Sequence, residues 1–133
     1  MCIRDSHNAR YERFGWAAAR LDDVLNLPGS RLTATLTVLL GADRAGALRA
    51  WRRDSAGHPS PNAGPVEAAF AGALGIRLGG TNTYGDRLED RAVLGDGQPA
   101  AAHDVPRARE LATWVDVGAL IVLLPIAARR RRR

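Results

Sequence analysis

The sequence predicts an all-α, integral membrane protein fragment with loop-rich segments outside the membrane. Two observations lead to this fold class. Apolar residues recur at helical spacing over much of the chain, and an apolar stretch near the C-terminus runs into a block of arginines. A third observation is the composition of residues 81–102, where glycine, aspartate and proline recur as turn residues, so we expect few regular elements there.

The first predicted helix covers residues 14–25, where apolar residues fall at i, i+3, i+4 and i+7, the pattern of one helix face. We expect Pro28 and Gly29 to interrupt it and Ser30 to cap a second segment, residues 32–40. That second segment is too short to span a bilayer alone, because spanning takes about 20 apolar residues.

A basic helix is expected over residues 45–53, and the loop HPSPNAG follows at residues 58–64. Proline restricts the backbone angle φ, whereas glycine can adopt φ values that other residues avoid. The loop is therefore predicted to be rigid and irregular, with its polar side chains held in set directions. Pro65 suits the first turn of the next helix, which we expect Gly79 and Gly80 to end.

Small residues recur at i, i+4 spacing in that helix, for example Ala68 and Gly72. Such faces let helix backbones approach closely, an arrangement used in membranes and also found in alanine-rich soluble helices. The spacing predicts close packing and leaves both settings open.

The last predicted helix runs from Val105 to Ala128. Its Val, Leu and Ile residues favour membrane insertion by roughly 4 kcal/mol, against a cost of about 3 kcal/mol for Asp116 at the bilayer centre. The balance favours insertion weakly, and we expect Asp116 to lie near one interface. Trp114 fits an interfacial aromatic belt, and the arginines of residues 129–133 fit a cytoplasmic end.

Charge and cysteine content restrict the partners and the compartment. The net charge of +5 equals the charge of the basic tail, residues 129–133, so the body of the chain is close to neutral and no nucleic-acid partner is expected. A basic soluble module that binds nucleic acid through this tail is a competing interpretation. The single cysteine, Cys2, permits no internal disulfide, so a reducing compartment is the default.

The first six residues, MCIRDS, have neither the apolar core nor the cleavage site of a signal peptide. We interpret residues 1–6 as a non-native leader, residues 7–128 as the body of the protein and residues 129–133 as a basic tail.

The first predicted helix carries a polar cluster. Paired acids hold Mg²⁺ through one or two carboxylates, and arginines bind phosphate. The alternative is a solvated helix face with an ion pair between Arg20 and Asp23. The members of the cluster are Arg20, Asp22, Asp23, Asn26 and Arg31.

The loop carries His58, Ser60 and Asn62, which are suited to binding an anion or orienting a carboxylate near the start of the following helix. The alternative is a helix-to-helix turn with a capping Ser or Asn. No second histidine lies at ligand spacing, so a zinc site is not expected. The glycine-rich segment 77–85 resembles a phosphate cradle only loosely, because it lacks the lysine and hydroxyl of that motif.

Taken in order, five segments resemble the C-terminal half of the CobD/CbiB family of cobalamin biosynthesis: RYERFGWAAARLDDVLN, RLTATL, HPSPNAG, EAAFAGALGIRLGGTNTYGD and LGDG. Members of that family are integral membrane adenosylcobinamide-phosphate synthases. The resemblance implies ATP-dependent amide formation between adenosylcobyric acid and aminopropanol phosphate, with Mg²⁺ accompanying the nucleotide. It also implies a multi-pass protein of the bacterial inner membrane, with membrane lipid and the missing N-terminal half of the same protein as partners.

We assign roles to individual residues from their chemistry, at positions that the resemblance marks. We expect Asp22 and Asp23 to hold the metal, and the catalytic residues to be His58, Ser60, Asn62 and Glu67. The substrate- and phosphate-binding residues are expected to be Arg20, Asn26, Arg31, Arg77, Asn82 and Tyr84. The fragment by itself is expected to be inactive, and the alternative function is a non-catalytic small membrane protein anchored by the C-terminal helix and its arginine tail.

Overall fold

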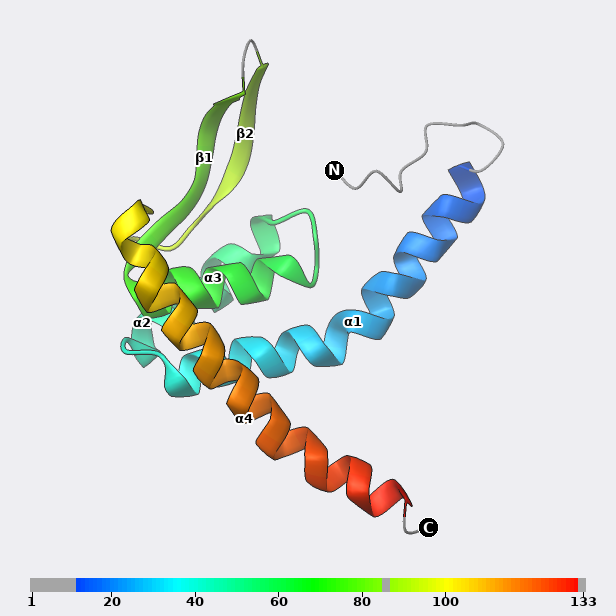
Figure 1. Ribbon diagram of the computed structural model, residues 1–133. Helices are drawn as coiled ribbons and strands as arrows, with labels where there is room; N and C mark the ends of the chain where they lie inside the picture. The colour runs from blue at the N-terminus through cyan, green and yellow to red at the C-terminus, as the bar shows by residue number, and fades with distance from the viewer. Residues whose placement is uncertain (1–11, 85–86, 132–133) are drawn as a thin grey trace.

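The computed structural model describes residues 12–84 and 87–131, and helices dominate this part of the chain (Figure 1). The helices are α1 (Glu12–Leu40), α2 (Arg44–Asp54), α3 (Ala63–Leu74) and α4 (Val105–Arg131), with single turns at η1 (Ser55–Gly57) and η2 (Ala102–Asp104). The strands β1 (Ile76–Tyr84), β2 (Arg87–Leu94) and β3 (Gln98–Pro99) form a small sheet of order β2-β1-β3. The mostly helical prediction is confirmed, but the all-α prediction is wrong because of this sheet.

Helix α1 passes through Pro28 and Gly29 without a break, so the predicted interruption is wrong. Proline removes one backbone donor and bends a helix where neighbouring groups supply other partners. Figure 1 shows α1 bending between its blue N-terminal half and its cyan C-terminal half. Ser30 lies inside the helix rather than capping it, and its hydroxyl is 3.1 Å from the Leu27 carbonyl oxygen.

Helices α2 and α3 form the closest contact of the fold. The carboxylate of Asp43 caps α2 by accepting the Gly46 N–H at 2.7 Å. Gly72 of α3 approaches α2 so closely that an added Cβ would collide with the Gly46 carbonyl oxygen. The close helix packing predicted from the small-residue spacing is therefore present, between α2 and α3.

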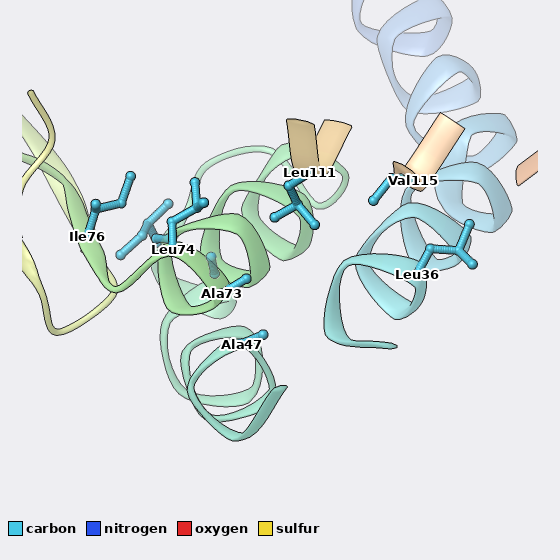
Figure 2. Close-up of a cluster of buried hydrophobic side chains, with 10 residues drawn as sticks. Leu36, Ala47, Ala73, Leu74, Ile76, Leu111 and Val115 are labelled. Carbon is cyan, nitrogen blue, oxygen red and sulfur yellow. The ribbon is translucent and has the colours of Figure 1, made fainter. Parts of the chain in front are cut away.

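The hydrophobic core draws on every helix and on the base of the sheet (Figure 2). Leu36 of α1 lies beside Val115 of α4, whereas Leu111 of α4 lies nearer to Leu74 of α3 (Figure 2). Helix α4 thus joins the core through its N-terminal half, and its later turns extend past the other elements (Figure 1). The buried members of the core are Leu36, Ala47, Ala68, Ala71, Ala73, Leu74, Ile76, Leu94, Leu111 and Val115.

Within the described residues, α4 is the helix long and apolar enough to cross a membrane. The candidate span is Ala102–Arg131, with a mean hydropathy of 2.0 in its most apolar window, of which 11% is buried. The exposed apolar side chains of this helix include Trp114, Val117, Leu120, Ile121, Val122, Leu123, Leu124 and Ile126. By length and composition α4 can span a bilayer, and the multi-pass arrangement stays a prediction.

Strands occupy much of the region that was predicted to be loop-rich. β1 and β2 pair antiparallel, and β3 pairs parallel to β1. The predicted stop at Gly79 and Gly80 is also wrong, because α3 already ends at Gly75, which has a φ of 67°. Gly79, with a φ of 81°, lies at a β-bulge where its backbone approaches the Ala92 carbonyl, so a side chain is excluded there.

An ionic cluster joins the base of the hairpin to the end of α2. The Asp54 carboxylate accepts the Gly95 N–H at 2.9 Å and pairs with Arg53, whose guanidinium also lies 2.7 Å from Asp96. The Asp54 side chain is only 8% exposed. Hydrogen bonding from Arg53, and then from Gly95 N–H, holds the pKa of the Asp54 carboxyl below its usual value against the opposing effect of burial.

Replacing Gly72 with Ala is expected to destabilise the fold, because the new methyl group would meet backbone atoms of Gly46 and Ala47. We expect a loss of about 1–3 kcal/mol in the free energy of unfolding, as for other overpacked sites. Gly29→Ala is the matched control, since nothing lies within 4 Å of that position, and it should stabilise α1 by about 0.5–1 kcal/mol. Urea unfolding followed by circular dichroism measures both, and equal stabilities would contradict the close α2–α3 contact.

The lowered pKa of Asp54 predicts an acid-sensitive fold. A carboxyl whose folded pKa lies below its unfolded value of about 3.8 stabilises the protein above that value, and this stability is lost as the pH falls through the folded pKa. Asp54→Asn keeps an oxygen for Gly95 N–H but loses the ion pair. Its stability should therefore change less than that of the unaltered protein as the pH is lowered from neutrality.

The measurement is thermal unfolding as a function of pH. Asp96→Asn is the control, because Asp96 pairs with the same Arg53 but its side chain is 63% exposed, whereas that of Asp54 is 8% exposed. Parallel pH curves for Asp54→Asn and the unaltered protein would contradict this account of the hairpin base.

Candidate functional site

The HPSPNAG segment follows η1, and its last two residues form the start of α3. Its loop part rests against α1 beside the bend of that helix. Asn62 makes the connection: its amide nitrogen donates to the Asp23 carbonyl at 2.9 Å, and its amide oxygen accepts from the Ser30 hydroxyl at 2.9 Å. The Asp23 carbonyl and the Ser30 hydroxyl lie on either side of Pro28, beside which α1 bends, and both bind a partner on the loop side of the helix. Asn62 therefore bridges the loop to the bent part of α1.

Arg31 adds a second connection at the same place. Its Nη1 donates to the Pro61 carbonyl at 2.9 Å and to the Ser30 hydroxyl at 3.1 Å. The residue is exposed, and a guanidinium has five N–H donors, so donors remain for an anion. Arg31 can thus hold the loop and face a phosphate at the same time.

Inside the loop, Ser60 caps α3. Its hydroxyl oxygen accepts the N–H groups of Ala63 at 3.2 Å and Asn62 at 3.4 Å, so the predicted turn with a capping serine is present. The Ser60 N–H in turn donates to Nδ1 of His58 at 3.0 Å. A neutral His58 with Nδ1 as acceptor carries its proton on Nε2.

That Nε2 atom faces a carboxylate of α3. The distance from His58 Nε2 to Glu67 Oε2 is 3.6 Å, and the two side chains are 20% and 47% exposed. An imidazole and a carboxylate in contact at a partly exposed edge can hold or move a proton. His58 and Glu67, which lie nine positions apart in the sequence, are therefore brought together.

The remaining polar residues of α1 lie on or near the same turns but are not gathered into one cluster. Arg20 lies over the Trp16 ring at 5.7 Å, and the described ion pairs include none between Arg20 and Asp23. The Asn26 amide donates to the Asp22 carbonyl at 2.9 Å. Asp23 is half-buried and Asp22 is exposed.

The metal role of Asp22 and Asp23 stays a prediction, and the helix geometry limits it. Consecutive helix residues point about 100° apart, so the two carboxylates do not converge on one point. In the part of the chain that the structure describes, no group of three or more His, Cys, Asp or Glu residues is placed to hold a metal ion. A Mg²⁺ ion here would take one carboxylate and obtain its other ligands from phosphates and water.

The three residues predicted from the glycine-rich segment lie on β1 instead of in a loop. Arg77 is exposed at the base of the hairpin, and Asn82 and Tyr84 lie toward its tip, in register with Glu89 and Arg87. β1 follows the C-terminal end of α3, whereas the HPSPNAG loop precedes its N-terminal end. The 12 residues of α3 span about 18 Å, so the structure does not bring these three residues to the loop.

Sequence reasoning missed two features of the site. Ser30 was interpreted as a cap, although it is the partner of Asn62, 32 positions away, and no spacing rule connects the two. The pairing of Arg53 and Asp54 with the LGDG turn was also missed, although that turn was singled out as a motif.

These features describe a mostly helical protein with one long apolar helix and a polar loop braced on the bend of another helix. Residues 6–112 match the family described as CobD/Cbib protein. The chain belongs to the CobD/Cbib family.

Curated relatives support this assignment. The "Cobalamin biosynthesis protein CobD" of Mycobacterium tuberculosis is 53% identical over 126 residues, which cover 92% of this chain and 40% of the relative. The protein of the same name from Stutzerimonas stutzeri is 50% identical over 117 residues, covering 88% and 38%. This chain thus spans about 40% of the length of the curated relatives and corresponds to their C-terminal part. No solved structure matches it.

Replacing Asn62 with Ala is expected to release the loop from α1, because it removes the bonds to Ser30 and to the Asp23 carbonyl. A loss of roughly 1–3 kcal/mol is typical when buried hydrogen-bond partners are left unsatisfied. Amide hydrogen exchange across residues 58–63 should therefore accelerate. Asn26→Ala is the control, since Asn26 makes an exposed bond within its own helix, and the prediction fails if both variants exchange at the same rate in the loop.

Proposed function

We propose that this chain is the C-terminal part of an adenosylcobinamide-phosphate synthase, an enzyme of cobalamin biosynthesis. The reaction would be ATP-dependent amide formation between adenosylcobyric acid and aminopropanol phosphate. The proposal is supported by membership of the CobD/Cbib family and by the names of the relatives, which assign those proteins to cobalamin biosynthesis. The observation that carries it is the polar loop held against α1, with His58 and Glu67 on one side and Arg31 on the other.

The chemistry sets clear demands. An amine attacks an activated carboxyl group, so a general base must take up the proton that the amine releases. Cationic groups must bind the phosphates, and water must be kept from the activated carboxyl group. ATP with its Mg²⁺ would supply the activation. In our proposal the residues of this chain bind, orient and transfer a proton around that event.

We assign the proton acceptor to Glu67. Its carboxylate is 47% exposed and contacts His58, whose other ring nitrogen is already occupied by the Ser60 N–H. His58 is thereby oriented, and its Nε2 proton can stabilise the Glu67 carboxylate before the transfer. Ser60 and Asn62 hold this arrangement by capping α3 and bridging to α1.

We assign phosphate binding to Arg31, whose free N–H groups lie beside the loop, and metal binding through a single carboxylate to Asp23. Arg20, Asp22 and Asn26 lie on neighbouring turns of α1. Together they would line the approach of the phosphates. Arg77, Asn82 and Tyr84 would contact substrate from the hairpin, at a point separate from the loop.

The non-catalytic alternative, a small protein anchored by α4, is supported by no observation beyond the apolar character of α4 itself. The comparisons favour the biosynthetic family. We therefore retain one proposed function.

The test is complementation by a chimera. Residues 7–133 are joined to the N-terminal part of the M. tuberculosis relative, expressed in a strain that lacks the synthase, and cobinamide phosphate is measured. We expect production by the chimera and a decrease of about 10²-fold or more for Glu67→Gln, the usual effect of removing a general base.

Glu110→Gln, at an exposed position of α4, is the matched control and should retain production. A chimera that is well expressed and membrane-inserted but makes no cobinamide phosphate would overturn the proposed function. Full production by Glu67→Gln would overturn the role of Glu67 alone.

A further inference from the structure

The N-terminal half of α1 has two different faces. One face carries the half-buried residues Asp23, Leu27 and Ser30 and lies toward the HPSPNAG loop. The other face carries Leu21, Val24 and Leu25, whose exposed fractions are 60%, 61% and 69%. Large apolar side chains on an ordered helix are rarely left in water as a continuous set. This second face therefore requires a cover that the described residues do not provide.

The exposed residues form a regular stripe. Ala17, Ala18, Leu21, Val24 and Leu25 follow the i, i+1, i+4, i+7, i+8 spacing of one helix side, and all five are exposed. The stripe is roughly 120° wide, the width of a face that packs on a protein core. We call these five residues the α1 stripe.

The composition around the α1 stripe favours protein over lipid as its cover. Arg20, Asp22 and Asp23 lie in the same turns, and within the described residues α4, but not α1, is long and apolar enough to cross a membrane. Helix α4 is apolar on all sides over its later turns, as a lipid-facing helix is, whereas the apolar stripe of α1 is flanked by charges and its exposed Trp16, on another side of the helix, lies against Arg20. The α1 stripe and the later turns of α4 thus suit different partners.

The length of the relatives identifies a partner for the α1 stripe. This chain corresponds to the C-terminal part of the M. tuberculosis relative and to 40% of its length, so most of the family's fold lies in the preceding part. The N-terminal half of α1 also extends away from the other described elements, which leaves the stripe accessible (Figure 1). We propose that the N-terminal part of the family's fold docks on the α1 stripe.

This docking has a consequence for the candidate site. The turns of α1 that carry Leu21, Val24 and Leu25 also carry Asp22 and the Asp23 carbonyl that Asn62 binds. A segment docked on the stripe would therefore border the polar residues of α1 from the side opposite the loop. The proposal depends on the packing of α1 and does not require the proposed reaction.

Cysteine labelling tests the docking. Val24→Cys and Ala19→Cys are made in a Cys2→Ser background, both in the 133-residue chain and in its fusion to the N-terminal part of the M. tuberculosis relative. Both positions are exposed in α1, but Ala19 lies on another side of the helix. Each protein is treated with a bulky, water-soluble maleimide in the same detergent. We expect Val24→Cys to react about tenfold or more slowly in the fusion, while Ala19→Cys reacts at a similar rate in both, because thiol reactivity follows exposure.

Other outcomes overturn the proposal. Equal rates for Val24→Cys in the two proteins would show that the N-terminal part does not cover the stripe. Equal slowing at both positions would show that the cover is not specific to it. Slow labelling in the chain alone that depends on protein concentration would assign the stripe to a second copy, and slow labelling of both proteins only in lipid vesicles would assign it to lipid. Because labelling needs no turnover, failure here and failure of the complementation test are distinguishable.

Discussion

The contact between Gly46 and Gly72 is the constraint on which the rest of the fold depends. The backbones of α2 and α3 touch at this point, because neither glycine has a side chain to hold them apart. Since the HPSPNAG loop joins the end of α2 to the start of α3, this contact also sets the positions of both ends of the loop. The hairpin follows directly from α3, and the Arg53–Asp54 cluster joins the base of that hairpin, after β2, back to α2.

The polar loop is also held by α1, at the turn that contains Pro28. A straight helix satisfies its own carbonyls and offers little to a neighbouring side chain, whereas a helix containing proline leaves part of its ladder open. Asn62 binds α1 beside its bend, at the Asp23 carbonyl and the Ser30 hydroxyl, and Arg31 completes the connection. His58, Ser60 and Asn62 therefore lie on a loop that is held against α1, and Glu67 lies on the helix that follows it, which suits a site that must keep its geometry during a reaction.

The exposed apolar surface of the chain divides into two kinds. Helix α4 is apolar around its later turns and ends in arginines, as a helix in contact with lipid does. The N-terminal half of helix α1 has an apolar stripe flanked by charged residues, as a helix in contact with protein does. A chain that spans about 40% of its relatives is expected to expose both, because the surfaces that the longer proteins bury within themselves are open here.

The sequence by itself determined the helices whose signals are local. The basic helix, the start of α4 at Val105 and the close-packing face at Gly72 depend on periodicity and on small residues, which act within a few turns. The family resemblance could likewise be recognised from short motifs, and the match of residues 6–112 to the family confirms it. Only the tertiary structure decided the passage of α1 through Pro28, the strands after Gly75, and the pairing of Asn62 with Ser30. The pairing of Asn62 with Ser30 joins residues 32 positions apart, whereas the strands pair within a hairpin, and in both cases the hydrogen bonds depend on a register that local residue preferences do not specify.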